Sequence, residues 1–404
     1  MNIVCVTGLG RVGLPTALTL ASRGLPVAGV DSNPSIIETL QKGKVTFEEK
    51  GMDALLEAAI RGGIEFRVKP AVTDFYIVAV PTPYDKKTKK IDPSHVVGAV
   101  RGILRVCLPN PIIVIESTVS PGTTDKYLRP LAAEAGVTAR FAHAPERVLP
   151  GGILYELERN ARIIGADDRE TAEQIRSVYA SFCRGMFTLT DIRTAEMAKI
   201  VENTFRDINI AFANELAKIC RSGGMDVYEI IRIANLHPRV NILHPGPGVG
   251  GHCISVDPWF LVGDYPMQSN LIHEARKIND SMPMYVLERV REIMAENNIS
   301  DTSRVGFYGV SYKEDVDDVR ESPTLQLLDL VKTCMGNEPK VFDPLLREKI
   351  TASQYMDFDR FIRDINFVII MVGHSRLTEH QKSFNGKIVL DTRNVYHREG
   401  VYRI

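Results

Sequence analysis

A glycine-rich turn close to the N-terminus constrains the fold more than any other feature of the chain. Residues 8–13 read Gly-Leu-Gly-Arg-Val-Gly. They lie between an apolar, β-branched segment from Asn2 to Thr7 and an apolar segment of helical period that runs to Arg23. A second apolar segment, Pro26 to Val30, ends on Asp31. Strand, glycine turn, helix, strand and acidic residue follow one another in dinucleotide-binding βαβ units, so we expect a parallel sheet to begin here.

Each position of this turn has a physical role. Gly8 permits the tight turn, Gly10 lets a pyrophosphate approach the backbone, and Gly13 lets the helix pack on the strand. The free amides at the helix N-terminus favour bound phosphate. Asp31 accepts hydrogen bonds from ribose hydroxyls and repels a 2′-phosphate, which favours NAD over NADP. We therefore predict NAD as the cofactor.

Small polar residues follow two further predicted strands. Phe75 to Val80 leads into Thr82, and Ile112 to Ile115 leads towards Thr118. Ligands of open α/β sheets bind at the carboxyl ends of the strands, so both threonines are candidate cofactor contacts. The alternative is that they are ordinary turn and capping residues. A short strand, Arg140 to Ala142, then leads into a loop whose Glu146 and Arg147 form either a solvated ion pair or a substrate contact.

One long helix is predicted from Ile192 to Arg221, capped by Thr190 or Asp191 and ended by Gly223-Gly224. Thirty residues span about 45 Å, which is enough to bridge two domains or to pair with a second copy. Six apolar residues at steps of three and four predict a buried stripe: Val201, Phe205, Ile208, Phe212, Leu216 and Ile219. Lys199, Asn203 and Arg206 form a polar row beside it. That row is either a solvated face or a group that polarises a substrate hydroxyl.

A single cysteine follows a second glycine-rich segment. Residues 246–258 read Gly-Pro-Gly-Val-Gly-Gly-His-Cys-Ile-Ser-Val-Asp-Pro, with Cys253 four residues before Asp257. A thiol, loop amides and a carboxylate are the groups needed to form and hydrolyse a thioester. Such a thiol requires a lowered pKa, which nearby cations and amides provide. A lone cysteine is more often a small buried apolar residue. His237 and Arg239 precede this segment and offer further polar groups.

The alternation of strands and helices returns after Arg304. Strands are predicted at Val305 to Val310, Val341 to Pro344, Phe367 to Val372 and Ile388 to Leu390, with a helix from Thr324 to Met335. This second sheet lacks a glycine fingerprint, so it is not a copy of the first. Its loops carry cationic groups that suit a phosphorylated ligand, although exposed charge is their usual role: Lys313, Arg320 and Arg393.

Composition excludes several classes of protein. The chain has 404 residues, a 44% hydrophobic share and a net charge of −1, so it lacks the basic excess of proteins that bind nucleic acid or acidic membranes. Its apolar runs are too short to span a bilayer, and its N-terminus does not resemble a signal peptide. The six cysteines are scattered and the histidines lack metal-ligand spacing. We expect reduced thiols, a cytoplasmic location and no metal site.

Taken together, these motifs resemble the UDP-glucose/GDP-mannose dehydrogenase family. The similarity covers the glycine turn, the Pro-Glu146-Arg loop, the Lys199-x-x-x-Asn203 helix and Gly-Gly-His-Cys253-Ile-Ser-Val-Asp257-Pro. It continues through Tyr312-Lys313 to Asp-Asp-Val-Arg320-Glu-Ser-Pro, and so extends over nearly the whole chain. The segments 202–215, 237–243 and 256–260 are most similar to members that act on UDP-N-acetyl-D-mannosamine. A histidine precedes Cys253, where members that act on UDP-glucose typically carry serine.

The resemblance implies a four-electron oxidation of C6 of this nucleotide sugar, with two NAD⁺ consumed and a Cys253 thiohemiacetal and thioester as intermediates. It implies an α/β fold with two Rossmann-like doubly wound sheets, joined by a helical middle domain with one long helix. The expected domains are 1–191 for NAD, 192–298 for dimerisation and catalysis, and 299–404 for the UDP-sugar. A homodimer through the long helix is expected.

The resemblance also assigns roles to residues. The catalytic candidates are Cys253, Lys199, Asn203, Asp257, Glu146 and Thr118. The cofactor candidates are Gly8, Gly10, Arg11, Val12, Gly13, Asp31, Thr82, Thr118 and Arg320. The substrate candidates are Arg147, Val148, Lys199, Asn203, Arg206, His237, Arg239, Gly250, Tyr312, Lys313 and Arg393.

Three alternatives remain open. The same chemistry on UDP-N-acetylglucosamine or UDP-glucose would use the same groups. A two-electron β-hydroxyacid dehydrogenase also places Lys-x-x-x-Asn on a helix after a nucleotide domain, but it has no need of Cys253. A catalytically silent nucleotide-binding protein is disfavoured by the intact set of Cys253, Lys199 and Asp257.

Overall fold

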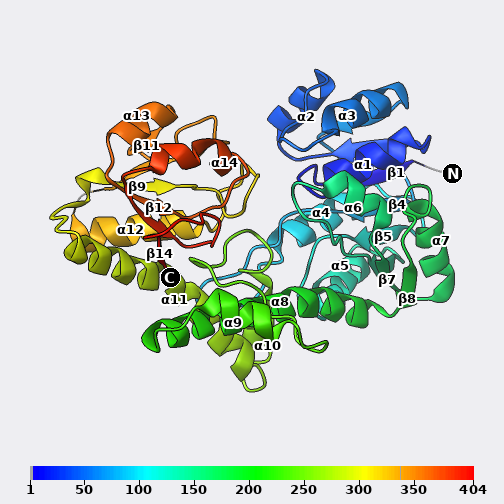
Figure 1. The fold of residues 1–404 in the computed structure, drawn as a ribbon. Helices are drawn as coiled ribbons and strands as arrows, with labels where there is room; N and C mark the ends of the chain where they lie inside the picture. Colours follow the sequence, from blue (N-terminus) through cyan, green and yellow to red (C-terminus); the bar gives the residue numbers. More distant parts are fainter. Residues whose placement is uncertain (1–2, 337) are drawn as a thin grey trace. The chain divides into compact units, whose positions relative to one another are not determined.

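A computed structural model describes residues 3–336 and 338–404, which divide into two compact units. The first unit extends to Glu202 and the second runs from Asn203 to Ile404. The division falls inside the long helix α8 (Ile192–Ser222) (Figure 1). Asn2, the first residue of the predicted N-terminal strand, lies outside the described residues.

The first unit is built on an eight-stranded sheet with the order β3-β2-β1-β4-β5-β6-β7-β8. Its neighbouring strands are parallel except for the antiparallel pair β6 and β7. The strands are β1 (Val4–Thr7), β2 (Val27–Val30), β3 (Glu65–Arg67), β4 (Phe75–Val78), β5 (Ile112–Ile115), β6 (Arg140–His143), β7 (Arg162–Ala166) and β8 (Phe187–Thr190). Every residue of β1, β2, β4 and β5 is buried, as expected for central parallel strands covered on both faces.

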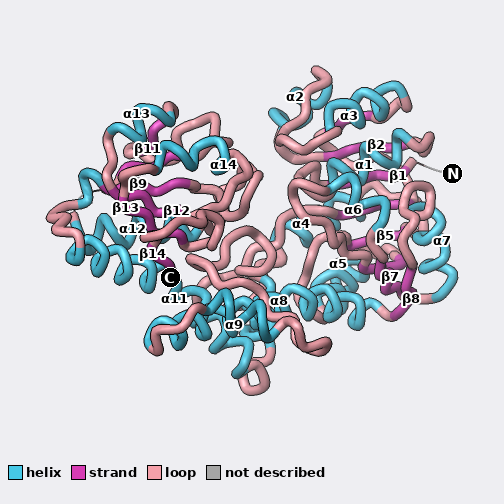
Figure 2. The backbone as a smooth tube through the Cα atoms, in the orientation of Figure 1, coloured by secondary structure: helices cyan, strands magenta, loops and turns pink. Residues whose placement is uncertain are grey.

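The helices of the first unit connect these strands, and Figure 2 draws them in cyan beside the magenta strands. They are α1 (Gly13–Ser22), α2 (Pro34–Gln41), α3 (Met52–Arg61), α4 (Ser94–Leu104), the π-helical η1 (Thr124–Leu128), α5 (Arg129–Glu134), α6 (Ile153–Arg159) and α7 (Arg169–Tyr179). Asp191 caps the N-terminus of α8 by accepting hydrogen bonds from the amide and hydroxyl of Thr194, which decides between the two predicted caps.

The second unit contains a six-stranded parallel sheet with the order β11-β10-β9-β12-β13-β14. Its strands are β9 (Val305–Tyr308), β10 (Lys340–Phe342), β11 (Gln354–Tyr355), β12 (Phe367–Ile370), β13 (Ile388–Asp391) and β14 (Tyr402–Arg403). Its helices after α8 are α9 (Val227–Ala234), α10 (Asp257–Asp264), α11 (Asn270–Glu296), η2 (Thr302–Arg304), α12 (Pro323–Met335), α13 (Phe358–Arg363), α14 (Leu377–His380) and η3 (Gln381–Phe384). The predicted fold class, two Rossmann-like sheets joined by a helical middle with one long helix, is confirmed.

The predicted buried stripe on α8 is wrong for the single chain. The exposed fractions of four of its six members are 48% for Val201, 66% for Phe205, 50% for Phe212 and 57% for Ile219, while Ile208 and Leu216 are half-buried. The helix instead turns small and polar residues inward, among them Ala213, Asn214 and Ala217. Small side chains allow a close approach of neighbouring helices, and the helical period alone does not say which face meets its own chain.

A buried polar chain joins α8 to α11. The Asp207 carboxylate pairs with the Arg276 guanidinium at 2.5 Å, and both side chains are almost completely buried. Burial, opposed by Arg276, raises the pKa of Asp207 to about 6. The Asn279 amide donates to Asp207 Oδ1 at 2.8 Å, and the Asn214 amide donates to Asn279 Oδ1 at 2.8 Å. Asn214 Oδ1 then accepts the amide hydrogen of Gly246 at 2.9 Å, which anchors the start of the glycine–cysteine segment.

Among the residues that the structure describes, none of the helices is both long and apolar enough to cross a bilayer. Within the same residues, no group of three or more His, Cys, Asp or Glu side chains is arranged to hold a metal ion.

Candidate active site

The first glycine turn has the shape that a dinucleotide requires. Gly8 has φ +94°, and a Cβ there would lie 2.5 Å from the Ala79 carbonyl oxygen. A Cβ at Gly13 would lie 1.9 Å from the Gly8 carbonyl oxygen, so the first and third glycines are packing positions. A Cβ at Gly10 would meet nothing within 4 Å. The middle glycine therefore faces open space that a pyrophosphate can fill, and the turn fits NAD.

The acidic residue after β2 is held against the same turn. Asp31 Oδ2 accepts the amide hydrogen of Leu9 at 2.9 Å, and Oδ1 accepts that of Asn33 at 2.9 Å. Thr82 is buried and Thr118 is half-buried, each just beyond the carboxyl end of its strand. Arg11 and Val12 are half-buried in the turn itself, with the Arg11 guanidinium 5.1 Å from the centre of the Phe47 ring.

Glu146 and Arg147 do not pair through their side chains, which excludes the simple solvated ion pair. Glu146 is buried, forms an ion pair with Arg162 Nη2, and accepts the Arg147 amide hydrogen at 2.6 Å. Arg147 pairs instead with Glu202 of α8, at 2.5 Å between Nη2 and Oε1. Both oxygens of the Glu146 carboxylate are therefore engaged within the first unit.

Arg162 also faces a second buried carboxylate. Its Nη1 lies 3.5 Å from Glu116 Oε1, and Glu116 further accepts hydrogen bonds from Tyr179 and Thr16. Burial raises the pKa of Glu116 to about 7; Arg162 opposes the shift and the Glu146 charge adds to it. Arg162 thus forms ion pairs with both Glu116 and Glu146. The sequence reading did not single out Arg162, although a charged residue at the start of the apolar run Ile-Ile-Gly-Ala is a visible signal.

Lys199 lies buried on α8, within electrostatic range of His143 at the end of β6. Complete burial lowers the pKa of His143 to about 3, and the Lys199 charge acts in the same direction. The imidazole is therefore neutral at ordinary pH. Lys199 and Asn203 lie one turn apart on the continuous helix.

Within the second unit, Asn203 is tied to the carboxylate beside the cysteine. Its side-chain amide donates to Asp257 Oδ2 at 2.5 Å, and both residues are buried. Asp257 is the first residue of α10, and its amide donates to the Cys253 carbonyl oxygen at 2.8 Å. Cys253 itself is exposed. The carboxylate and the thiol thus belong to one hydrogen-bonded turn.

The glycines before Cys253 let this segment pack on the loop after β9. A Cβ at Gly250 would lie 2.7 Å from Tyr312 Cβ, and one at Gly251 would lie 2.8 Å from the Tyr312 ring. The Gly251 amide donates to the Arg320 carbonyl oxygen at 2.9 Å. A Cβ at Gly246 would lie 2.6 Å from Arg393 Nη1. The structure therefore brings the cysteine segment, Tyr312 and Arg393 together.

Arg320 is a cationic residue that contacts the cysteine segment. Its guanidinium forms a two-pronged hydrogen bond with Asp318, at 3.0 and 2.6 Å to Oδ2. Burial disfavours the cation, but the Asp318 carboxylate outweighs burial and raises the pKa of Arg320; Cys253 contributes electrostatically. Burial and the Arg320 charge lower the pKa of the half-buried His252, so its imidazole is neutral beside Cys253.

The remaining predicted substrate residues differ in their surroundings. Val148 and Lys313 are half-buried, whereas Arg206, His237 and Arg239 are exposed. Arg393 is half-buried and lies 3.7 Å from Glu314. The sequence reading missed Asn214 and a buried cluster around His374, because hydrogen bonds between distant segments leave no local pattern.

Comparison with known proteins identifies the family of the chain. Residues 1–183, 193–281 and 306–398 match the NAD binding, central and UDP binding domains of the UDP-glucose/GDP-mannose dehydrogenase family. The chain belongs to this family, and it is an NAD-dependent dehydrogenase of the nucleotide-sugar class.

Particular relatives are similar over almost their whole length. UDP-N-acetyl-D-mannosamine dehydrogenase of Methanocaldococcus jannaschii is 40% identical over 98% of this chain and 93% of its own. NDP-N-acetyl-D-galactosaminuronic acid dehydrogenase of Ralstonia nicotianae is 38% identical over 97% and 96%. The solved UDP-N-acetyl-mannosamine dehydrogenase of Staphylococcus aureus superposes with a TM-score of 0.89 at 38% identity, covering 99% of this chain and 98% of its own.

Proposed function

We propose that the chain oxidises C6 of UDP-N-acetyl-D-mannosamine from alcohol to carboxylate, giving UDP-N-acetyl-D-mannosaminuronate. The observation that carries the proposal is the hydrogen-bonded unit of Cys253, Asp257 and Asn203, with Tyr312 and Arg320 packed on the same segment. A two-electron alcohol dehydrogenase has no need of a thiol there. The names of the most similar relatives support the sugar.

NAD⁺, held by the Gly8–Gly13 turn and Asp31, supplies the hydride acceptor for both oxidations. In the first, Lys199 takes the proton of the C6 hydroxyl, either directly or through a water held by Asp257. Lys199 and the Asn203 amide then stabilise negative charge on the same oxygen. Their spacing of one helical turn suits two groups that act on one atom.

Cys253 acts on the aldehyde. Its thiolate adds to C6 and forms a C–S bond, and the carbonyl oxygen takes a proton from Lys199, giving a thiohemiacetal. Return of the hydroxyl proton to Lys199 and loss of a second hydride then leave a thioester. This addition is required because an unhydrated aldehyde has no suitable C6 hydride to lose, whereas the thiohemiacetal has one. Arg320, which interacts electrostatically with Cys253, favours the thiolate.

Hydrolysis regenerates the thiol. Water attacks the thioester carbon, the C–S bond breaks, and the sulfur leaves as the thiolate. Asp257 or Glu146 takes the proton of this water, and the place of Asp257 in the same hydrogen-bonded turn as Cys253 favours Asp257. Thr118 remains a candidate to orient the water.

The other predicted residues bind the substrate. Tyr312, Lys313 and Arg393 suit the nucleotide, since a ring and two cations match a base and a diphosphate. The sugar contacts are proposed for Arg147, Val148, Arg206, His237, Arg239 and Gly250. Arg320 is retained as a cofactor contact, and the domain boundaries 1–191, 192–298 and 299–404 remain part of the proposal.

A homodimer through α8 is part of the proposal. Four large apolar side chains on this helix are about half or more exposed: Val201, Phe205, Phe212 and Ile219. Apolar side chains repeated along one helix face favour a partner surface, and a second copy of the same helix is self-complementary.

The test counts NADH formed per UDP-N-acetyl-D-mannosamine consumed and identifies the acid by mass. We expect two NADH per sugar, and slower turnover of UDP-N-acetylglucosamine, UDP-N-acetylgalactosamine and UDP-glucose. One NADH per sugar with an accumulating aldehyde would contradict the thioester route. Faster turnover of another sugar would leave the chemistry in place and correct the substrate.

A further inference from the structure

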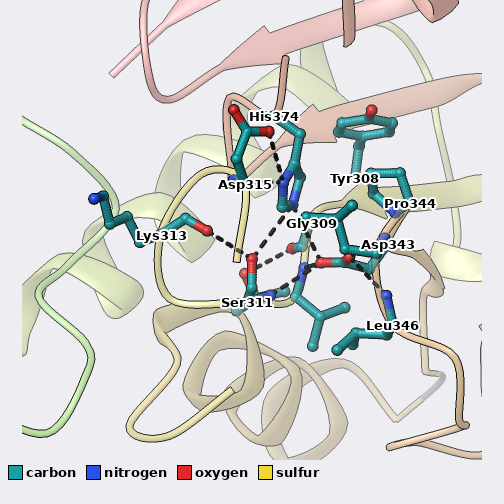
Figure 3. Close-up of polar contacts among 12 residues, drawn as sticks. Tyr308, Gly309, Ser311, Lys313, Asp315, Asp343, Pro344, Leu346 and His374 are labelled. Carbon is teal, nitrogen blue, oxygen red and sulfur yellow. Dashed lines mark hydrogen bonds and ion pairs between the residues drawn. The ribbon is translucent and has the colours of Figure 1, made fainter. Parts of the chain in front are cut away.

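A buried polar cluster in the second unit takes no part in the reaction proposed above. It consists of Ser311, Asp343 and His374, whose exposed fractions are 0%, 4% and 1%. The three residues follow β9, β10 and β12, so they meet at the carboxyl edge of the second sheet (Figure 3). Buried polar groups of this kind fix geometry, because each lost hydrogen bond leaves a desolvated atom.

Asp343 holds the base of the loop that follows β9. Its Oδ2 accepts the amide hydrogens of Val310 at 2.7 Å and Ser311 at 3.0 Å. Its Oδ1 accepts those of Leu345 at 2.9 Å and Leu346 at 3.3 Å. Burial acts to raise the pKa of this carboxyl, but His374 and the amides of Val310 and Leu345 outweigh burial and lower it. Asp343 is therefore a carboxylate that joins two loops.

The hydrogen bonds of His374 fix which ring nitrogen carries the proton. Nδ1 accepts the Asp315 amide hydrogen at 3.1 Å, and an amide can only donate, so Nδ1 carries the lone pair. The proton therefore lies on Nε2, which is 3.3 Å from Asp343 Oδ2 and 3.3 Å from Ser311 Oγ. The ring thus connects the base of the loop to its far bend.

That bend is strained and doubly held. Asp315 has φ +58°, a backbone conformation that non-glycine residues seldom adopt. Besides the bond to His374, its carboxylate accepts the amide hydrogen and the hydroxyl of Ser375 at 2.9 and 3.0 Å. Two consecutive residues after β12 therefore hold the bend in place.

The loop held in this way carries two of the proposed nucleotide contacts. Tyr312 donates its amide hydrogen to the Asp318 carbonyl oxygen at 2.9 Å, which closes the loop. The Lys313 carbonyl oxygen accepts the Ser311 hydroxyl at 2.8 Å, while its side chain points away from His374 (Figure 3). The cluster therefore fixes the backbone from which the Lys313 ammonium extends.

We propose that His374 is a positioning residue for nucleotide binding: its Nδ1 acceptor fixes Asp315, and thereby the orientation of Tyr312 and Lys313 towards the UDP group. The inference rests on the proposed function, which makes these two residues substrate contacts. It assigns His374 no contact with the substrate and no proton transfer.

Two matched substitutions separate this role from simple packing. In His374→Asn the amide oxygen takes the place of Nδ1 and can accept the Asp315 amide hydrogen. In His374→Gln the side-chain amide reaches the place of Nε2 and can donate a hydrogen bond to Asp343, but the Asp315 amide hydrogen loses its acceptor. Both variants lose the imidazole ring, which lies 6.3 Å from the centre of the Tyr308 ring.

We expect His374→Asn to keep the UDP dissociation constant within about twofold, and His374→Gln to raise it about tenfold, as for one lost hydrogen bond in a preorganised loop. The KM for the UDP-sugar should follow the UDP constant while kcat at saturation changes little. The exposed variant Ser375→Ala should raise the UDP constant by a smaller factor, because Oδ1 of Asp315 keeps the Ser375 amide. Calorimetric titration with UDP and steady-state kinetics measure these quantities, and NAD affinity is the internal control.

Two outcomes would overturn the inference. If His374→Asn and His374→Gln weaken UDP binding equally, the imidazole acts only through packing. If UDP binding is unchanged in both His374→Gln and Ser375→Ala, His374 does not position the loop. If the unsubstituted chain neither binds UDP nor turns over any UDP-sugar, it is the proposed function that fails, together with the inference that rests on it.

Discussion

The side-chain amide of Asn203 donates a hydrogen bond to Asp257 Oδ2 at 2.5 Å, which joins α8 to the turn that carries Cys253. Both groups are buried, so the contact is not a chance encounter of surface side chains. It brings together an amide and a carboxylate, 54 positions apart, that we propose as members of the catalytic set.

Substitution of this amide should affect turnover more than binding. In Asn203→Asp a second carboxylate would face Asp257, and the two like charges would raise the pKa of one of them. We expect kcat to fall about 100-fold, as for loss of one charge-assisted hydrogen bond in a reacting site, with NAD affinity unchanged. Stopped-flow NADH formation measures the rate. Asn209→Asp on the same helix is the control, and an equal loss there would contradict a local effect.

Removal of the thiol should block acid formation alone. Cys253→Ala is expected to lose at least about 1000-fold in the rate of acid release, while NAD still binds. Cys253→Ser should form an ester that hydrolyses slowly and accumulates, which intact-protein mass spectrometry detects as an added UDP-sugar acyl group. Cys334→Ala, at another exposed cysteine, is the matched control. A fully active Cys253→Ala would refute covalent catalysis.

The middle glycine of the NAD turn offers a substitution with little structural cost. A Cβ at Gly10 meets nothing within 4 Å, so Gly10→Ala should fold normally. The methyl group occupies the space that the pyrophosphate needs, and we expect at least tenfold weaker NAD binding, about 1.4 kcal/mol. Gly98→Ala in α4 also meets nothing within 4 Å and should keep NAD affinity. Unchanged NAD binding in Gly10→Ala would argue against the assigned role of the turn.

The exposed apolar face of α8 predicts a concentration-dependent dimer. Phe205→Glu combined with Phe212→Glu should shift the chain towards monomer, since each buried phenylalanine contributes about 1.5–3 kcal/mol to an interface. Sedimentation velocity over a range of concentrations measures the change. Glu215→Ala, an exposed polar position on the same helix, should leave the oligomer unchanged. An unsubstituted chain that stays monomeric at all concentrations would contradict the proposed interface.

Buried Glu116 should give a pH-dependent contribution to stability. Its pKa is raised to about 7, well above the value of an unfolded glutamate, so the folded state binds the proton more tightly. The resulting stabilisation is fully present below about pH 4.5 and is lost as the pH rises through about 7. The unsubstituted chain loses this stabilisation as the pH rises, whereas Glu116→Gln does not titrate at this position. We therefore expect the free energy of unfolding of Glu116→Gln, relative to that of the unsubstituted chain, to increase by about 2 kcal/mol between pH 5 and pH 8. Urea unfolding at each pH measures it, with Glu134→Gln as an exposed control. A difference that does not change with pH would show that the Arg162 pair keeps Glu116 ionised throughout.

The sequence predicted most of what depends on local pattern. The strands β1, β4, β5 and β12 were predicted because buried parallel strands are short, continuous apolar runs, and the bounds of α8 followed from its cap and its terminal glycines. β7 was not predicted because it begins with the charged residue Arg162. β3 was not predicted because Phe66 is its only buried residue.

The site was predictable only in part. Cys253, Asp257 and Lys199 were predicted as site residues from their types and spacing, and their roles remain predictions. The prediction that the apolar face of α8 is buried within the chain was wrong, because periodicity identifies an apolar face but not the surface that it packs against. Contacts such as Glu146–Arg162 and His374–Asp315 join residues far apart in the chain, and only the three-dimensional arrangement reveals them.

Because Gly250 and Gly251 have no side chains, the cysteine segment packs directly against Tyr312. Engineers who wish to change the sugar preference by randomising one of these segments alone should recover few active clones. Positions 250, 251 and 312 need to be varied together, because a side chain added at Gly250 or Gly251 fits only if a smaller residue replaces Tyr312.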